Sequence, residues 1–305
     1  MSRPPAISLI QAMPVVFVLI WSTGFIVARY GMPHAPPMSF LALRYALSIL
    51  CFLPWILLAG VAWPGRKSQW MHLSVSGILM HACYLGGVWA AVKAGMGAGL
   101  SALIIGLQPV LTAICLSASG GAVAARQWLG LGLGFAGLLL VVSTKFGPGG
   151  EANWLNTGLA VGALLSITAG TLYQKKFIQP CDVRSANLVQ LAAALVVTLP
   201  LALLEPAAIA WESELLWAMA WSVLALTLGG SSLLYLLIER GAATSVASLM
   251  YLVPPSTALL AWLLFNEPIT VITLAGTGLS VLGVALVVHQ AKTQTAASQT
   301  NKETQ

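Results

Sequence analysis

The amino-acid sequence predicts an all-α membrane protein with ten transmembrane helices arranged as two inverted five-helix repeats. Of its 305 residues, 58% are hydrophobic and only 7% are charged, whereas a soluble domain has roughly a quarter of its residues charged. Apolar runs of about 20 residues recur along the chain, and each is long enough to cross a bilayer as a helix. A third observation is a set of similar residues that recurs at one constant separation.

Breaks at glycine, proline and charged residues divide the chain into ten apolar runs. The first five are Ser8–Ala28, Met38–Gly60, Met71–Val92, Ala98–Ala118 and Gln127–Ser143, and the second five are Trp154–Tyr173, Ala186–Leu204, Leu215–Ile238, Ala243–Phe265 and Ile269–His289. We therefore expect one repeat over 8–143 and another over 154–289. Residues 290–305 are polar without periodicity, which predicts a disordered cytoplasmic tail.

Similar residues occupy the two halves at a separation of 146 positions. The pairs are Gly24 and Gly170, Ser39 and Ser185, Gly95 and Gly241, Leu103 and Leu249, Pro109 and Pro255, Gly130 and Gly276, and Gly137 and Gly283. A single offset that holds from the first run to the fifth indicates a duplicated five-helix unit. Because five is odd, the second unit enters the membrane from the opposite side, and inverted repeats are typical of secondary transporters.

Basic residues are distributed unevenly between the two sides that these runs define. If the N-terminus is cytoplasmic, the outer side holds only Arg29, Lys93 and Lys145, and the inner side holds Arg3, Arg66, Lys67, Arg126, Lys175, Lys176, Arg184, Arg240, Lys292 and Lys302. Basic residues resist translocation and collect on the cytoplasmic side. We therefore expect a multi-pass protein with cytoplasmic N- and C-termini.

Two apolar runs carry prolines near their middle. Pro109 lies in the fourth run, and Pro254 and Pro255 lie in the ninth. A proline inside a helix removes a hydrogen bond and kinks the helix, and interruptions at corresponding positions of two repeats indicate a binding site between the repeats. We assign these prolines to helix kinks and gating. The alternative is a pair of packing kinks inherited from one ancestral helix.

Five polar or aromatic side chains lie near the expected kinks or in neighbouring runs. These candidates for lining a substrate cavity are Trp21, His81, Tyr84, Gln108 and Tyr251. His81 and Tyr84 share a helix face because they are three residues apart. Histidine titrates near neutral pH, so His81 is a candidate proton carrier or substrate contact. The alternative is that His81 only makes a hydrogen bond between helices.

Arg44 lies inside the second apolar run, about six residues from its outer end, or roughly 9 Å in a helix. Its guanidinium group is therefore within reach of the outer interface by snorkelling. Alternatively, Arg44 turns inward and holds an anionic group such as a carboxylate. The residue 146 positions later is Gln190, which is also polar and weakly favours an inward position.

Several functional classes lack a sequence signature. The chain has no HExxH, GxSxG or phosphate-binding P-loop motif, no acidic residue deep in an apolar run, and four singly placed cysteines, so we expect neither an enzyme nor a cofactor or metal site. The sequence also has no basic cluster of the kind that binds nucleic acid. The expected partners are a small-molecule substrate and the lipid bilayer. The GxxxG spacing of Gly130 and Gly134 packs helices within a monomer or mediates a homodimer.

Two rival functions remain open at this point. An intramembrane enzyme on a lipid-like substrate would use His81 and Arg44, but it lacks a paired acid and base. A non-transporting membrane scaffold is disfavoured by the short loops and by the absence of a soluble partner-binding domain in the sequence.

Several segments resemble the EamA-type branch of the drug/metabolite transporter superfamily. They are LIWSTGFIVARYG, SFLALRYAL, AGLSALIIGLQPVLTAI, QWLGLGLGFAGLLLVV, ATSVASLMYLVPPSTALLAWLLFNEPIT and LAGTGLSVLGVALVV. The resemblance covers nearly the whole chain, and its motifs are specific as a set. It implies a bacterial inner-membrane protein with ten helices in two inverted repeats, a central cavity, and efflux or exchange of small metabolites such as amino acids.

The resemblance also assigns individual residues. Arg44 matches the arginine of the family's second helix, Pro109 and Pro255 match prolines of its fourth and ninth helices, and Glu267 matches the glutamate that closes the ninth, a structural position. Gly121 stands at the equivalent position of the first half, which departs from the pattern and argues against symmetric gating. The sequence thus predicts a secondary transporter that exports a small organic metabolite by alternating access.

Overall fold

The computed structural model describes residues 9–118, 125–146, 150–230, 232–233 and 250–286. In these ranges the chain is helical apart from turns, short linkers and one isolated bridge between Phe146 and Ala152. The elements are α1 (Leu9–Gly31), α2 (Pro37–Leu58), α3 (Lys67–Gly77), η1 (Ile78–Cys83), α4 (Tyr84–Lys93), α5 (Ala98–Ile105), α6 (Gln108–Ala118), α7 (Ala125–Lys145), α8 (Trp154–Phe177), α9 (Val183–Leu203), α10 (Ser213–Trp221), η2 (Ser222–Gly229), η3 (Met250–Leu252) and α13 (Val253–Phe265).

By length and composition, five described helices can cross a membrane. They are Pro37–Leu58, Lys67–Lys93, Trp128–Lys145, Trp154–Phe177 and Val183–Leu203. Shorter apolar helices of 10–17 residues are Val15–Gly31, Ala98–Thr112, Ser213–Gly229, Val253–Phe265 and Val271–Leu286. These helices overlap the apolar runs of the sequence, which confirms the all-α membrane class. The predicted tail, 290–305, and the segment 234–249 lie outside the described residues.

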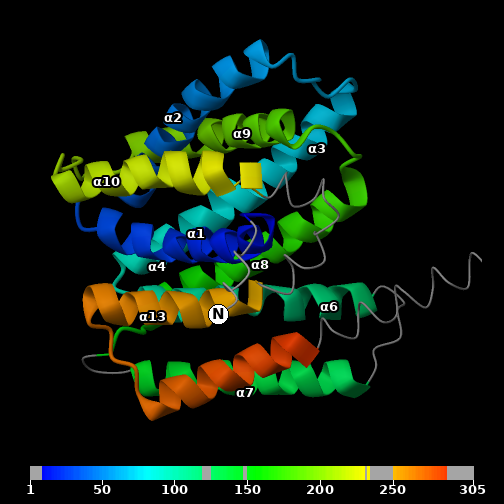
Figure 1. The fold of residues 1–305 in the computed structure, drawn as a ribbon. Helices are drawn as coiled ribbons and strands as arrows, with labels where there is room; N and C mark the ends of the chain where they lie inside the picture. Colours follow the sequence, from blue (N-terminus) through cyan, green and yellow to red (C-terminus); the bar gives the residue numbers. More distant parts are fainter. Residues whose placement is uncertain (1–8, 119–124, 147–149, 231, 234–249, 287–305) are drawn as a thin grey trace, which may run out of the picture.

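The helices pack side by side into one bundle (Figure 1). In that view α2, α9 and α10 lie on one side, α1, α4 and α8 in the middle, and α13, α6 and α7 on the other side. α2 packs along α9, α4 along α8, and α1 against both α10 and α13. The buried side chains of these helices form a continuous core that includes Tyr45 of α2, Trp89 of α4 and Leu191 of α9.

Two helices are interrupted by π-helical segments at corresponding places. η1 separates α3 from α4, and η2 follows α10 without a break. Adding 146 to the limits of η1 gives residues 224 and 229, which lie within η2. Single-turn π segments are rare and occur frequently at functional sites. His81 lies in η1 and Thr227 in η2, again 146 positions apart.

The predicted proline kinks have different outcomes. α5 ends at Ile105 and α6 begins at Gln108, so the chain breaks just before Pro109, as the sequence predicts. Pro254 and Pro255 lie in the first turn of α13, after the short 3₁₀ turn η3. The residues before this turn lie outside the described part of the chain, so the expected kink in the ninth run stays a prediction.

Equivalent positions in the two halves make equivalent contacts. A Cβ atom on Gly24 would lie 4.0 Å from Leu226, and one on Gly170 would lie 2.6 Å from Met80; Gly170 and Leu226 each follow their counterpart by 146 residues. A close approach of two further helices shows the same relation. A Cβ atom on Gly137 would clash with the carbonyl oxygen of Gly276, and one on Gly283 would clash with that of Gly130. Ser280 Oγ donates to the carbonyl oxygen of Gly134, its own counterpart, at 3.2 Å.

Two glutamates cap helices that are distant in sequence. Glu267 accepts hydrogen bonds from the backbone N–H groups of Ala98 and Gly99 at the start of α5, at 2.9 and 3.3 Å. Glu205 does the same for Met38 and Ser39 at the start of α2, at 2.9 and 2.8 Å. Carboxylates are favourable there because the first N–H groups of a helix have no intrahelical partner. Gly121, the counterpart of Glu267, lies outside the described residues.

Candidate functional site

A cavity of about 130 Å³ lies in the middle of the bundle. It is lined by residues of α1, α2, η1, α4, α8, α9 and η2: Trp21, Gly24, Phe25, Arg44, Tyr45, Met80, His81, Tyr84, Leu85, Trp89, Ile167, Asn187, Leu191, Leu226 and Thr227. We call this space the central cavity. It combines aromatic walls with a few polar groups, which is the usual composition of a small-molecule site. Both π-helical segments contribute to it, through His81 and Thr227.

Arg44 turns into the central cavity instead of snorkelling to an interface. Its side chain is buried, with an exposed fraction of 8%. Nε and Nη2 donate to Thr227 Oγ1 at 3.3 and 3.2 Å, and Cζ lies 5.8 Å from the centre of the Trp89 ring. Within the described part of the chain, no carboxylate oxygen lies within 4 Å of the guanidinium nitrogens. The cavity therefore contains a buried positive charge that has no acidic partner among the described residues.

Contacts beside the cavity also link the two halves. The Gln190 side chain lies beside the His81 ring and donates to Ser76 Oγ at 3.3 Å. Because Gln190 is the counterpart of Arg44, and Thr227 that of His81, the pairs Arg44–Thr227 and Gln190–His81 occupy equivalent positions. Tyr45 completes the wall, since its hydroxyl group donates to the His81 carbonyl oxygen at 2.9 Å.

Three buried polar atoms have no hydrogen-bond partner among the described residues. They are Trp89 Nε1, Ser48 Oγ and Ser222 Oγ. Trp89 lines the central cavity, Ser48 lies one helical turn after Arg44, and the Ser222 carbonyl oxygen accepts from Thr227 Oγ1 at 2.9 Å. Buried polar groups are usually satisfied, and of these three residues only Trp89 lines the central cavity.

The structure brings four of the predicted site residues together and separates one from them. Trp21, Arg44, His81 and Tyr84 all line the central cavity. Gln108 does not line it and instead donates from Nε2 to Thr171 Oγ1 at 3.0 Å. Tyr251 lies in η3, but its side chain is outside the described residues.

Sequence reasoning missed two cavity residues that contact Arg44. Trp89 is one of eleven tryptophans, and nothing in the sequence distinguishes it. Thr227 does carry a signal, because it lies 146 positions after His81. A comparison of all polar residues 146 positions apart, and not only of identical ones, would have identified Thr227 as a candidate.

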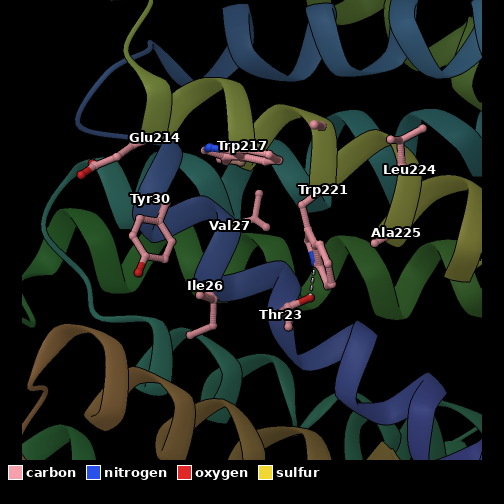
Figure 2. Close-up of a pocket in the computed structure, with 11 residues that line it drawn as sticks. Thr23, Ile26, Val27, Tyr30, Glu214, Trp217, Trp221, Leu224 and Ala225 are labelled. Carbon is pink, nitrogen blue, oxygen red and sulfur yellow. Dashed lines mark hydrogen bonds between the residues drawn. The ribbon is translucent and has the colours of Figure 1, made fainter.

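A second, larger space of about 750 Å³ lies between α1 and the α10–η2 helix. Figure 2 shows Val27 on α1 pointing toward Trp217 and Trp221 of α10, with Tyr30 and Ile26 as further lining residues of α1. Trp221 Nε1 donates to Thr23 Oγ1 at 2.8 Å (Figure 2), and at the Tyr30 end Glu214 accepts from His34 at 3.0 Å. We call this space the α1–α10 groove. Its lining is mainly apolar and aromatic. The groove lies next to the central cavity, because Thr23 and Ala225 line the groove while their chain neighbours Gly24 and Leu226 line the cavity.

The equivalent interface in the other half, between α3 and α8, is closed by a different set of side chains. His72 Nδ1 and the Tyr173 hydroxyl group lie 2.8 Å apart, and the His72 and Phe177 rings stack at 5.3 Å. We call these three residues the His72 cluster. Their counterparts 146 positions away are Ala218, Val27 and Gly31. These counterparts are small or aliphatic, whereas all three residues of the His72 cluster have aromatic rings.

Comparison with known proteins places this fold in a family. The model of the EamA-like transporter family matches residues 8–143 and 156–289, nearly the whole chain. The chain belongs to the EamA-like transporter family. This assignment confirms the resemblance recognised in the sequence, and it makes the protein a membrane-embedded transporter of small molecules instead of an enzyme.

Curated relatives of this EamA-like transporter agree with the assignment. A protein of Bacillus subtilis named uncharacterized transporter YvbV is 28% identical, with 92% of each chain covered. An uncharacterized transporter of Archaeoglobus fulgidus is 26% identical, over 88% of this chain and 93% of the relative. A Salmonella typhimurium protein named probable amino-acid metabolite efflux pump is 24% identical, over 88% and 90%.

A solved crystal structure supports the fold alone. It is similar to this chain with a TM-score of 0.64 at 18% sequence identity, and the match covers 92% of this chain and 97% of the other.

Proposed function

We propose that this EamA-like transporter exports a small organic metabolite carrying an anionic group, which Arg44 binds in the central cavity. The observation that carries the proposal is the buried guanidinium group without a carboxylate partner among the described residues. A buried charge is strongly unfavourable unless it is paired, and intramembrane ionisable residues typically mark substrate pathways. A substrate carboxylate supplies the missing partner, and arginine holds it with two parallel hydrogen bonds.

We propose alternating access of two inverted repeats, 8–143 and 154–289, as the transport mechanism. A two-fold relation between the halves is supported by pairs of matching contacts in which each residue is replaced by its counterpart 146 positions away. Ser280 bonds its own counterpart, Gly134, as expected for two residues at the axis of such a relation. Two similar halves can exchange conformations of similar energy around a site between them. The unequal interfaces support the same mechanism, because the His72 cluster closes one side while the α1–α10 groove leaves the other open.

We assign the groove to the outer side of an inner membrane and the His72 cluster to the inner side. The excess of basic residues supports cytoplasmic N- and C-termini, which places the C-terminal end of α1, and with it Tyr30, outside. One relative of this chain, the YedA protein of Escherichia coli, is named an inner membrane transporter. The efflux direction follows the name of the Salmonella relative.

The proposed function is tested by comparing the culture media of cells that overproduce the wild type or Arg44→Gln at equal membrane levels. We expect at least one metabolite that carries a carboxylate or another anionic group to accumulate outside cells only with the wild type. Cells without the plasmid-borne protein give the background. Identical media from all three strains would refute export through the Arg44 cavity.

The His72 cluster yields a separate prediction about access. Tyr173→Phe removes the hydroxyl group that bonds His72 and is expected to raise the inward-open population roughly 2- to 12-fold, the range for one hydrogen bond of about 0.5–1.5 kcal/mol. The measurement is labelling of Leu191→Cys, a cavity position, by an impermeant maleimide in inside-out vesicles. All native cysteines are replaced beforehand.

Tyr30→Phe is the matched control for this labelling experiment. Tyr30 lines the α1–α10 groove, and its replacement also removes one hydroxyl group while leaving the His72 cluster intact. We expect its labelling rate from the inner side to equal that of the parent. Equal rates in all three proteins would show that the His72 cluster does not hold the inner side closed.

A further inference from the structure

The central cavity has an unbalanced charge, and this restricts the substrate. Among the described residues that line it, Arg44 is the only one with a formal charge and none is acidic. We propose that the substrate is a small monocarboxylate without an ammonium group, so that it carries a net charge of −1, and is not a zwitterionic amino acid. This inference rests on the proposed function, because it names the chemical class of the substrate for the same cavity.

The donors around the cavity support the carboxylate. Thr227 occupies Nε and Nη2 of Arg44, but a guanidinium group has five N–H donors, so others remain for a ligand. The buried Trp89 Nε1 is a donor without a partner in the described structure, and an indole N–H cannot accept. A carboxylate beside Arg44 fits these donors, because its two oxygens accept several hydrogen bonds and donate none. It accepts from the remaining guanidinium N–H groups directly, and from Trp89 Nε1 after a small side-chain shift that opens this buried atom to the cavity.

The acceptors argue against an ammonium group. Such a group has three donors and needs acceptors or a nearby negative charge. Thr227 Oγ1 already accepts from Arg44 and donates to the Ser222 carbonyl oxygen. The other polar lining residues, such as Tyr45, Tyr84 and Asn187, offer only uncharged acceptors, and no carboxylate lies among the described lining residues to balance an ammonium charge. The Trp89 ring, which could attract a cation, is already beside Arg44. A zwitterion would also bring its ammonium charge close to the guanidinium group, where like charges repel.

The size of the cavity restricts the substrate further. Its volume of about 130 Å³ is smaller than the ~300–1,000 Å³ typical of sites for drug-sized ligands. The aromatic side chains of Trp21, Tyr84 and Trp89 line it, which favours an apolar body behind the carboxylate. The inferred substrate is therefore a short organic acid with an aliphatic or small aromatic body.

Matched ligand pairs test the inference on the purified full-length protein in detergent. Each pair has the same number of non-hydrogen atoms and differs only in a hydroxyl or an ammonium group at carbon 2: glycolate and glycine, 2-hydroxy-3-methylbutanoate and valine, and 3-phenyllactate and phenylalanine. Calorimetric titration at pH 7.5 measures each affinity. We expect at least one hydroxy acid to bind, and to bind at least ~10-fold more tightly than its amino acid, since each factor of ten is 1.4 kcal/mol.

Trp89→Phe tests the second donor. It keeps an aromatic ring but removes Nε1, and we expect about tenfold weaker binding of the best hydroxy acid, as for a lost hydrogen bond to a charged group. Trp128→Phe, at an exposed position of α7, should bind like the wild type. Melting curves in detergent identify any variant that fails to fold.

Three results would overturn the inference: equal or tighter binding of the amino acids, no binding of any hydroxy acid, or unchanged affinity in a folded Trp89→Phe protein. Its failure is distinguishable from failure of the proposed function. Arg44-dependent excretion of a zwitterionic amino acid would refute the monocarboxylate and preserve the exporter, whereas media that do not depend on Arg44 would refute the exporter itself.

Discussion

Gly77→Val is expected to prevent the accumulation of folded protein. Gly77 ends α3 and lies directly against the backbone of α9, because a Cβ atom on it would be 2.5 Å from both Cα and the carbonyl oxygen of Gln190. A flexible side chain could yield to the new atoms, but a helix backbone cannot. Overpacking typically costs ~1–3 kcal/mol, and we expect at least the upper value, out of a total stability of roughly 5–15 kcal/mol.

The measurement is the yield of monodisperse protein after detergent extraction, together with its melting temperature. Gly162→Val is the matched control, because Gly162 is also helical and exposed, and a Cβ atom on it would have no neighbouring heavy atom within 4 Å. Both variants carry the same β-branched cost in a helix, so their difference reports the contact with Gln190. Similar yields and melting temperatures would mean that α3 and α9 do not approach this closely.

Arg44→Gln is expected to lower the rate of substrate export by about 30-fold or more at subsaturating substrate. Truncating one partner of a buried, hydrogen-bonded charge pair costs about 2–5 kcal/mol, and each 1.4 kcal/mol is a factor of ten. Arg44→Lys keeps the charge but loses the planar fork that matches a carboxylate. We therefore expect its rate to lie between those of the wild type and Arg44→Gln.

The initial rate of anion release from preloaded cells measures these effects at equal protein levels. Arg126→Gln, at an exposed position near the start of α7, removes one positive charge far from the cavity lining and should leave the rate unchanged. An Arg44→Lys rate as low as that of Arg44→Gln would show that the fork geometry, and not the charge alone, is required. An Arg44→Gln rate equal to the wild type would remove Arg44 from the substrate site.

The helical class was predictable because it follows from composition and from the length of apolar runs. The family was also predictable, since its motifs extend over nearly the whole chain and the family model matches the same regions. Arg44, His81 and Trp21 were recognisable as unusual polar or amphipathic side chains within apolar runs, and all three line the central cavity.

Other parts of the site depend on packing that sequence patterns do not report. Gln108 is as polar as a cavity residue, but its helix directs it to Thr171. Trp89 has no distinguishing feature in the sequence, and it becomes part of the site only because α4 places its ring beside Arg44 of α2. The closed α3–α8 interface could be recognised only once both helices were placed, because His72 and Tyr173 are 101 residues apart in the sequence.

Counterflow into proteoliposomes tests the central claim, carboxylate transport through the Arg44 cavity, most directly. Vesicles with equal amounts of wild type or Arg44→Gln are loaded with the organic acid that binds most tightly, and uptake of the labelled acid is followed. We predict rapid, transient accumulation with the wild type and uptake at the protein-free background with Arg44→Gln. Equal accumulation by both proteins, or none by the wild type, would contradict this account.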